Sequence, residues 1–137
     1  MNGAVIYTRV SSREQQQEGF SLEAQSRTLR DYAARGGYTI AATFQDVETA
    51  KTTGREAFSE MGAWLKRNQP CRVVLVEKTD RLYRDFSDAV TIEKLDVEVH
   101  LVKDGTVLSR DSKSQDKLIH GIHLVMAKSY IDNLREE

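Results

Sequence analysis

Apolar stretches with strand-like patterns alternate along this chain with segments that have helical spacing. The largely uncharged run at 4–10 is rich in residues that favour strands and predicts a buried strand. The continuous apolar run at 72–76 is typical of a central strand in a parallel sheet. Further strands are expected at 38–44 and 97–102, and helices at 21–35, 55–67, 86–95 and 114–137.

This alternation predicts an α/β fold with three layers: a mostly parallel sheet of four to five strands, flanking helices and a long C-terminal helix. Ser21 is expected to cap the first helix, Gly36-Gly37 to end it, and Asp85 to cap the third. Functional residues of such sheets gather at the carboxyl ends of the strands. Those ends are predicted at Ser11, at Asp46 and its loop, at 78–85 and at Lys103-Asp104.

The last predicted helix is apolar on more than one face. A helix of this kind needs two partners, and we expect its own sheet layer on one side and another subunit on the other. The alternative is a fully buried helix, which a domain of this size rarely encloses. The apolar residues are Leu118, Ile119, Ile122, Leu124, Val125, Met126, Tyr130, Ile131 and Leu134.

The first predicted strand carries polar residues with the period of a strand. Tyr7, Arg9 and Ser11 fall on one side of it. A buried arginine is costly unless it is paired, and its guanidinium matches a phosphate or a carboxylate. A serine hydroxyl beside it could reach a bound phosphate. Taken alone, this motif favours the structural alternative, in which Arg9 pairs with a core carboxylate and Ser11 caps a turn.

Charged residues also crowd the segment that follows the third predicted strand. Arg81 and Arg84 are three apart, so one helical turn would place them on the same side. Asp80 could hold one guanidinium in place, and the next helix would point its N–H groups at an anion. A solvated, salt-bridged loop is the alternative, but the charges lie at the functional edge of the sheet.

Five cations are predicted near this edge: Arg9, Arg55, Lys78, Arg81 and Arg84. They would overload one site unless a multiply charged anion were bound there. A phosphodiester approaching its pentavalent state fits that description. Polar side chains that could orient these groups are Glu14, Gln15 and Gln25.

Composition narrows the classes of function. The 137 residues suit one domain, and a net charge of −1 is unusual for a free-standing DNA-binding domain. The single cysteine, Cys71, indicates a reducing compartment such as the cytoplasm, and no signal peptide or membrane span is predicted. The chain lacks the GxxxxGK[ST] loop of ATP-binding proteins. We interpret His100, His120 and His123 as structural, so no metal site is expected.

Together, these residues resemble the serine recombinase family of resolvases, invertases and large phage-type integrases. The resemblance runs from about Gly3 to the last helix. It rests on four segments in order, of which the one at 19–25 is most similar to the large integrase branch. They are Tyr-Thr-Arg-Val-Ser at 7–11, Gly-Phe-Ser-Leu-Glu-Ala-Gln at 19–25, Thr-Gly-Arg at 53–55 and Thr-Asp-Arg-Leu-Tyr-Arg-Asp at 79–85.

The resemblance implies a role for each motif residue. Ser11 would be the nucleophile, although Ser12 adjoins it and only the spacing to Arg9 favours Ser11. Asp80 would fix arginine geometry or take part in proton transfer. Arg9, Arg81 and Arg84 would bind the scissile phosphate, Arg55 and Lys78 would support them, and Tyr7, Gln25 and Asp46 would lie behind these groups.

The implied reaction leaves a 5′-phosphoserine link and a free 3′-hydroxyl, and a tetramer would exchange and religate the strands. It would need no ATP, cofactor or metal, because arginines take the role that metals play elsewhere. The family has DNA-binding domains beyond the long helix. Residues 1–137 are therefore interpreted as a catalytic fragment, with 113–137 beginning an interface helix. Alone, it should bind double-stranded DNA weakly and assemble into dimers or tetramers.

Two other functions remain open on sequence. A small α/β phosphoesterase could use the same arginines on small phosphorylated molecules. A non-catalytic domain could assemble through the last helix. Neither accounts for the combined set of motifs.

Overall fold

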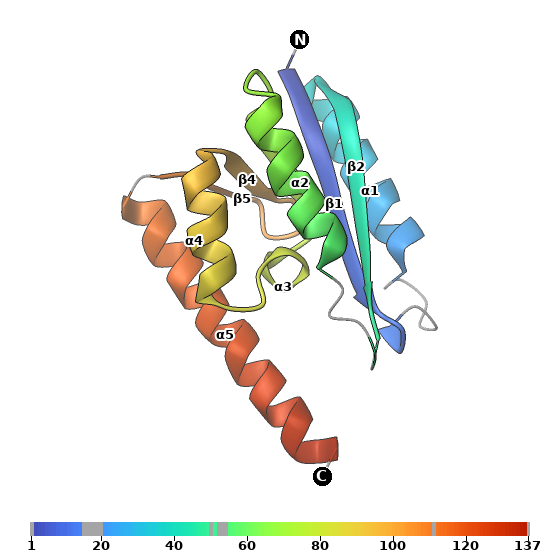
Figure 1. The fold of residues 1–137 in the computed structure, drawn as a ribbon, viewed down its shortest axis with the longest axis vertical. Helices are drawn as coiled ribbons and strands as arrows, with labels where there is room; N and C mark the ends of the chain where they lie inside the picture. Colours follow the sequence, from blue (N-terminus) through green and yellow to red (C-terminus); the bar gives the residue numbers. More distant parts are fainter. Residues whose placement is uncertain (1, 15–20, 50, 52–54, 111, 137) are drawn as a thin grey trace.

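The domain is built on one five-stranded sheet in the order β2-β1-β3-β4-β5 (Figure 1). The computed structural model describes residues 2–14, 21–49, 51, 55–110 and 112–136, without the side chains of 112, 114 and 129–136. Four strands are parallel, and β5 runs antiparallel to β4. The strands are β1 (Asn2–Ser11), β2 (Tyr38–Glu48), β3 (Val73–Val76), β4 (Glu98–Leu101) and β5 (Thr106–Leu108).

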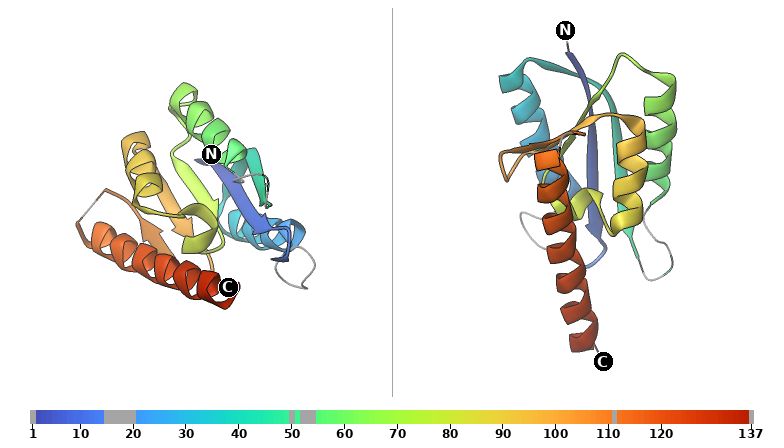
Figure 2. Two further views of the ribbon diagram at one scale, coloured as in Figure 1. Left: turned by 60° about the horizontal axis from the view of Figure 1, so that its bottom comes forward. Right: turned by 90° about the vertical axis from the view of Figure 1, so that its left-hand side faces the viewer.

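Helices cover both faces of the sheet, so the predicted three-layer architecture is confirmed. α1 (Leu22–Gly36) covers one face, and α2 (Glu56–Arg67) and α4 (Phe86–Leu95) cover the other (Figure 2). A single turn, α3 (Thr79–Leu82), follows β3. α5 (Ser112–Glu136) packs beside β5, α3 and α4, and its C-terminal half extends beyond the sheet (Figures 1 and 2).

Alternation along β1 divides the hydrophobic core between the two faces. Val5 and Tyr7 belong to the cluster under α2 and α4, whereas Ala4 and Ile6 pack under α1 with Leu29. All five side chains are almost completely buried. Because both faces of β1 are covered, the strand reads in sequence as one apolar run rather than as alternation.

The predicted helix caps are confirmed. The Ser21 hydroxyl accepts a hydrogen bond from the Ala24 N–H at 3.0 Å, and the Asp85 carboxylate accepts one from the Asp88 N–H at 3.2 Å. Gly37 adopts a left-handed conformation, with φ of 75°, and ends α1.

Three boundaries differ from the sequence prediction. β2 continues to Glu48, so Asp46 lies inside a strand opposite Arg9 and not in a loop. The strand passes through this acidic residue because hydrogen bonds satisfy the buried carboxylate. The charged segment after β3 contains the helical turn α3. The strand at 106–108 was not located from sequence, because three residues are too short to show a period.

Several sequence predictions lie outside the described residues. They concern Gln15, the Gly19-Phe20 and Thr53-Gly54 parts of two motifs, and Glu137. The side chains of Tyr130, Ile131 and Leu134 are likewise not described. Among the described helices, none has the length and apolar character that a membrane crossing requires.

Candidate active site

The candidate site forms where β1 extends beyond the end of its neighbour β3. β1 pairs with β3 only as far as Ile6, but with β2 as far as Ser11. The Gln25 side chain takes the place of the missing strand: its Nε2 donates to the Arg9 carbonyl at 3.0 Å, and its Oε1 accepts from the Arg9 N–H at 3.2 Å. Gln25 is fully buried. Its amide therefore fixes the backbone of Arg9 to α1.

The Arg9 guanidinium is held mainly by main-chain carbonyls of α3. Its Nη2 donates to the Asp80 carbonyl at 2.5 Å, and its Nε donates to the Arg81 carbonyl at 3.3 Å. Nη1 forms a 3.4 Å ion pair with Glu48. Burial, followed by the nearby charge of Arg55, lowers the pKa of Arg9. The group thus carries a charge that a bound anion would stabilise.

Arg81 lies behind Arg9 and is only 4% exposed. Its Nη1 donates to the Arg9 carbonyl at 3.2 Å and to Glu14 Oε1 at 2.9 Å. Its Nε lies 3.7 Å from Glu77 Oε1. Arg81 therefore connects the end of β1 to α3. Its Nη2 group makes no hydrogen bond to the described residues.

Ser11 is locked to Glu14 by two reciprocal hydrogen bonds. The Ser11 Oγ accepts from the Glu14 N–H at 3.1 Å, and Glu14 Oε1 accepts from the Ser11 N–H at 3.1 Å. Because the same Oε1 binds Arg81, Glu14 joins the serine to the arginine. Burial raises the pKa of Glu14, but hydrogen bonds from Arg81 and Ser11 outweigh it and leave the pKa below its ordinary value. The side chain of Ser12 is exposed, and its N–H donates to the Glu48 carbonyl.

Arg55 is buried in a second cluster beside the first. Its Nη2 donates to the Leu82 carbonyl at 3.0 Å and lies 2.9 Å from Asp88 Oδ2. Its Nη1 donates to the Tyr7 hydroxyl at 3.3 Å, and the guanidinium stacks 3.8 Å from the centre of the Phe58 ring. These contacts fix Arg55 between β1, α2 and α4.

Asp46 connects Tyr7 to the start of α2. The Tyr7 hydroxyl donates to Asp46 Oδ2 at 2.6 Å, and the carboxylate accepts from the N–H groups of Ala57 and Phe58 at 2.9 and 3.0 Å. The residue at the N-cap position, Arg55, supplies no side-chain cap, so Asp46 caps the helix from a neighbouring strand. Burial, reinforced by Asp46, raises the pKa of Tyr7 and keeps its phenol protonated.

Arg84 lies at the rim of the site with its side chain 36% exposed. Its N–H donates to Asp88 Oδ2 at 2.7 Å, and its Nε lies 3.9 Å from the same oxygen. Asp88 therefore links Arg84 to Arg55. Lys78 is half-buried at the end of β3, immediately before α3.

Asp80 acts differently from the sequence prediction. Its carboxylate was expected to hold a guanidinium, but the Oδ2 lies 3.7 Å from Lys128 Nζ on α5. The part of Asp80 that holds Arg9 is its main-chain carbonyl. The helical turn explains why the carbonyl of Asp80, and not its carboxylate, holds Arg9. Successive carbonyls of the turn point toward β1, whereas the Asp80 side chain points toward α5.

Sequence reasoning missed four charged residues of the network. Asp88 binds two arginines, Glu48 pairs with Arg9, Glu77 pairs with Arg81 and Lys103, and Lys128 pairs with Asp80. Glu77 and Asp88 each lie four residues from an arginine, and that spacing was the available signal. The ion pair between Lys128 and Asp80 joins residues far apart in the sequence, so no local sequence pattern predicts it.

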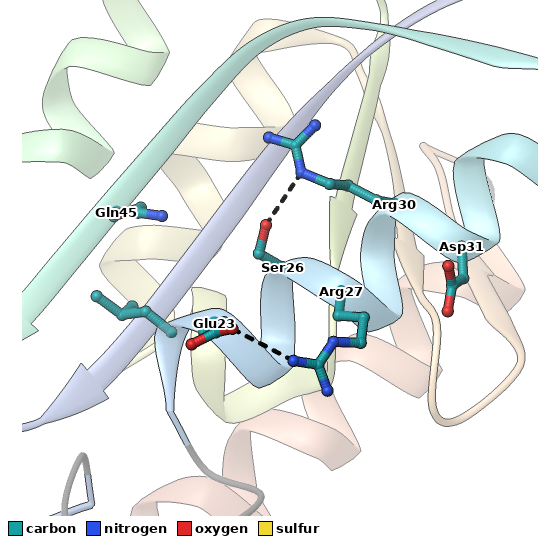
Figure 3. Close-up of a pocket in the computed structure, with 7 residues that line it drawn as sticks. Glu23, Ser26, Arg27, Arg30, Asp31 and Gln45 are labelled. Atoms are coloured by element: carbon teal, nitrogen blue, oxygen red, sulfur yellow. Dashed lines mark hydrogen bonds and ion pairs between the residues drawn. The ribbon is translucent and has the colours of Figure 1, made fainter.

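A separate surface groove lies away from the candidate site. It has a volume of about 590 Å³ and is lined by α1 and by Gln45 of β2 (Figure 3). Its two arginines are engaged within the helix, Arg27 with Glu23 at 3.3 Å and Arg30 with Ser26 at 3.2 Å. The lining residues are Leu22, Glu23, Ser26, Arg27, Arg30, Asp31 and Gln45, none of which belongs to the predicted site.

Comparison with known proteins identifies relatives of this fold. The sequence model of the family described as "Resolvase, N terminal domain" matches residues 4–137. A resolvase family site-specific recombinase from Streptococcus pneumoniae shares 26% identity and a TM-score of 0.71, with 99% of this chain and 95% of that chain covered. The catalytic domain of ISC1926 TnpA, an IS607-like serine recombinase, shares 26% identity and a TM-score of 0.60, with 84% and 75% covered.

A third structure, the N-terminal catalytic domain of TP901-1 integrase, has the same fold. Its TM-score is 0.68 at 23% identity, with 99% of this chain and 100% of that chain covered. A search among curated protein sequences found no match. Because the family model spans almost the whole sequence and the structural relatives share the fold, the chain belongs to the resolvase family of serine recombinases.

Proposed function

We propose that this domain cleaves DNA during site-specific recombination, with Ser11 as the nucleophile. The observation that carries the proposal is the joining of Ser11 to a buried arginine pair at the end of β1. Glu14 connects the serine to Arg81, and Arg81 in turn holds the carbonyl of Arg9. A nucleophile beside preorganised cations is the arrangement that phosphoryl transfer requires.

Electrostatics support a phosphate as the ligand. Burial and mutual repulsion lower the pKa of Arg9, so an anion at this point would relieve an existing cost. Arg84 at the rim is exposed enough to meet a phosphate oxygen. Arg55 and Lys78 add positive charge behind it. In this proposal, Arg9, Arg81 and Arg84 bind the scissile phosphate, and the other two support them.

In the proposed step, the Ser11 oxygen attacks phosphorus and loses its hydroxyl proton. The new bond joins Oγ to phosphorus, and the bond from phosphorus to the 3′ oxygen breaks. The departing 3′ oxygen takes up a proton and becomes a hydroxyl. Rejoining reverses the step with another 3′-hydroxyl, so no bond energy is lost and ATP is not needed.

Assembly of two or more copies would use the face shared by α4 and α5. Four apolar side chains are exposed there, and the contact between Phe86 and His123, with ring centres 5.2 Å apart, brings the two helices together. Exposed apolar patches of this kind mark protein interfaces. The residues are Phe86, Val90, Ile119 and Met126, and we call them the α4–α5 patch.

The decisive experiment detects the covalent intermediate. The chain is fused to a DNA-binding module of known site and incubated with a nicked suicide duplex, from which the cleaved strand cannot be rejoined. Mass spectrometry then maps the adduct. We expect a phosphodiester link on Ser11 that is absent from the Ser11→Ala variant.

Ser12→Ala is the matched control and should retain the adduct. An adduct that disappears only with Ser12→Ala would contradict the assignment of Ser11. Hydrolysis of a generic aryl phosphate without any DNA adduct would favour a phosphoesterase instead. If DNA is bound but no adduct forms, cross-linking shows whether a tetramer has assembled, and an assembled but inactive tetramer would overturn the proposal.

A further inference from the structure

The turn α3 is the junction between the arginine cluster and the long helix. On one side, the carbonyls of Asp80 and Arg81 hold the guanidinium of Arg9, and the carbonyl of Leu82 holds Arg55. On the other side, α3 packs against α5. A shift of this single turn would move three of the acceptors that position the cations.

Two residues of α5 define how it sits on α3. A Cβ atom added to Gly121 would lie 3.2 Å from Thr79 Cγ2 and 3.3 Å from Thr79 Oγ1, which is closer than ordinary van der Waals contact. Lys128 Nζ lies 3.7 Å from Asp80 Oδ2. The two positions are seven residues apart, so they lie on the same face of the helix. Gly121 leaves no free space for a side chain beside Thr79, and Lys128 contributes an ion pair two turns later.

The partly buried carboxylate of Asp80 provides a reason for the lysine at position 128. Asp80 Oδ1 is buried without a hydrogen-bond partner among the described residues, and Oδ2 is the oxygen that meets Lys128. A carboxylate beside the arginines would repel an incoming phosphate. Lys128 therefore compensates this charge from outside the turn.

We propose that Gly121 and Lys128 are positioning residues, which set the placement of Arg9 and Arg81 through α3. The proposal rests on the proposed function, since the arginines it positions are those assigned to the phosphate. Exposed Ile119 and Met126 lie on the same helix. A partner that packs on α5 would therefore act on the arginines through this contact.

The first test replaces Gly121 by alanine in the DNA-binding fusion and measures the rate of Ser11 adduct formation at saturating DNA. The added methyl group requires Thr79 to give way by a few tenths of an ångström. We expect α3 to shift with it and the rate to fall by about 10-fold. The control is Gly62→Ala in α2, where a Cβ meets no atom within 4 Å. That variant should keep the parent rate.

Another test removes the Thr79 atoms that a methyl group at position 121 would contact. Thr79→Ala removes both atoms that the new methyl group would meet and leaves only Thr79 Cβ, at 3.7 Å. The double variant Gly121→Ala/Thr79→Ala should therefore recover the rate of Thr79→Ala alone. Likewise, Lys128→Arg should keep the rate, because it keeps the charge, whereas Lys128→Met should lower it.

A further measurement does not depend on cleavage. The Nε–H resonances of Arg9 and Arg81 are recorded by NMR in the chain without DNA. They should shift in Gly121→Ala, return in the double variant and stay in place in Gly62→Ala. If the parent fusion formed no adduct, the proposed function would fail, but these resonances would still decide the present inference.

The inference would be overturned by unchanged Arg9 and Arg81 resonances in Gly121→Ala. It would also be overturned if Gly121→Ala and Gly62→Ala formed adduct at the same rate, or if the double variant failed to recover. A purely structural role for the glycine would lower the melting temperature of Gly121→Ala without changing the rate of the folded protein at saturating DNA.

Discussion

Arg9 carries its positive charge into the interior and is held there mostly by carbonyl oxygens. Carbonyls fix the guanidinium without neutralising it, and the one carboxylate that reaches it among the described residues, Glu48, is half-exposed. Arg81 is held differently, because two carboxylates pair with it, Glu14 at 2.9 Å and Glu77 at 3.7 Å. The residual positive charge at the end of β1 therefore lies mainly on Arg9, and a fixed cation of this kind is what a phosphate site needs.

Glu14 gives the site a dependence on pH that can be measured. Its pKa in the folded protein is below the ordinary 4.5, so its stabilising contribution is present at neutral pH and is lost as the pH falls through the folded value. We expect wild-type protein to be more stable than Glu14→Gln at pH 7, with the difference disappearing well below pH 4.5. Urea unfolding at several pH values measures it. A difference that stays constant down to about pH 3 would contradict the assignment.

The Tyr7 hydroxyl is the subject of another residue-scale prediction. Tyr7→Phe removes the donor to Asp46 and leaves Arg55 Nη1 without its acceptor in the interior. We expect a loss of about 2 kcal/mol in the free energy of unfolding, since an unsatisfied buried group costs about that much. Tyr38→Phe, at a half-buried ring that stacks on Tyr32, is the control and should be nearly neutral. Equal losses in both variants would argue against the network.

At the scale of elements, side chains complete hydrogen bonding that the sheet leaves open. Gln25 pairs with the backbone of Arg9 beyond the end of β3, and Asp46 caps α2 from β2. Both join elements that are far apart in sequence. The end of β1 is therefore rigid although it has a strand on only one side.

Gln25→Leu tests this bridge between elements. The substitution keeps the volume but leaves the Arg9 N–H without its acceptor, so we expect a loss of about 2 kcal/mol in unfolding free energy. The rate of Ser11 adduct formation should fall as well. Gln45→Leu, at an exposed position of β2, provides the control. Unchanged stability in Gln25→Leu would show that solvent or another group replaces the amide.

At the scale of the whole molecule, α5 divides its apolar residues between the core and the surface. Leu118 and Ile122 are buried, whereas Ile119 and Met126 are 44% and 42% exposed. A helix with this division has one partner within the domain and a free face for another. The α4–α5 patch supplies that face next to the turn that holds Arg9.

The exposed α4–α5 patch predicts that copies of this chain associate, and that lysines introduced into the patch abolish the association. We expect the chain to sediment as a dimer or larger at high micromolar concentration, and Ile119→Lys/Met126→Lys to shift it to monomer, because burying two ammonium groups is costly. Val107→Lys on β5 is the control, since Val107 is also 44% exposed but lies outside the patch. A wild-type monomer at these concentrations would refute the prediction.

Local sequence patterns predicted the layers of this protein and the residues that its candidate site brings together. Hydrophobic periods located the four parallel strands and the major helices, and Ser21 and Asp85 marked helix starts because capping is local. The positions of Arg9, Ser11 and Arg81 at strand ends followed from the same patterns, since parallel strands end at one edge of the sheet.

The tertiary structure alone decided how those residues are connected. Asp46 caps a helix that begins beyond the next loop, Asp80 turns to Lys128 on α5, and Gln25 stands in for a strand. These contacts join segments separated by the folding of the chain, and no local period or spacing encodes them. The sequence by itself thus determined which groups reach the edge of the sheet where the candidate site lies, and only the fold decided which partners hold them there, because those partners depend on distances in space.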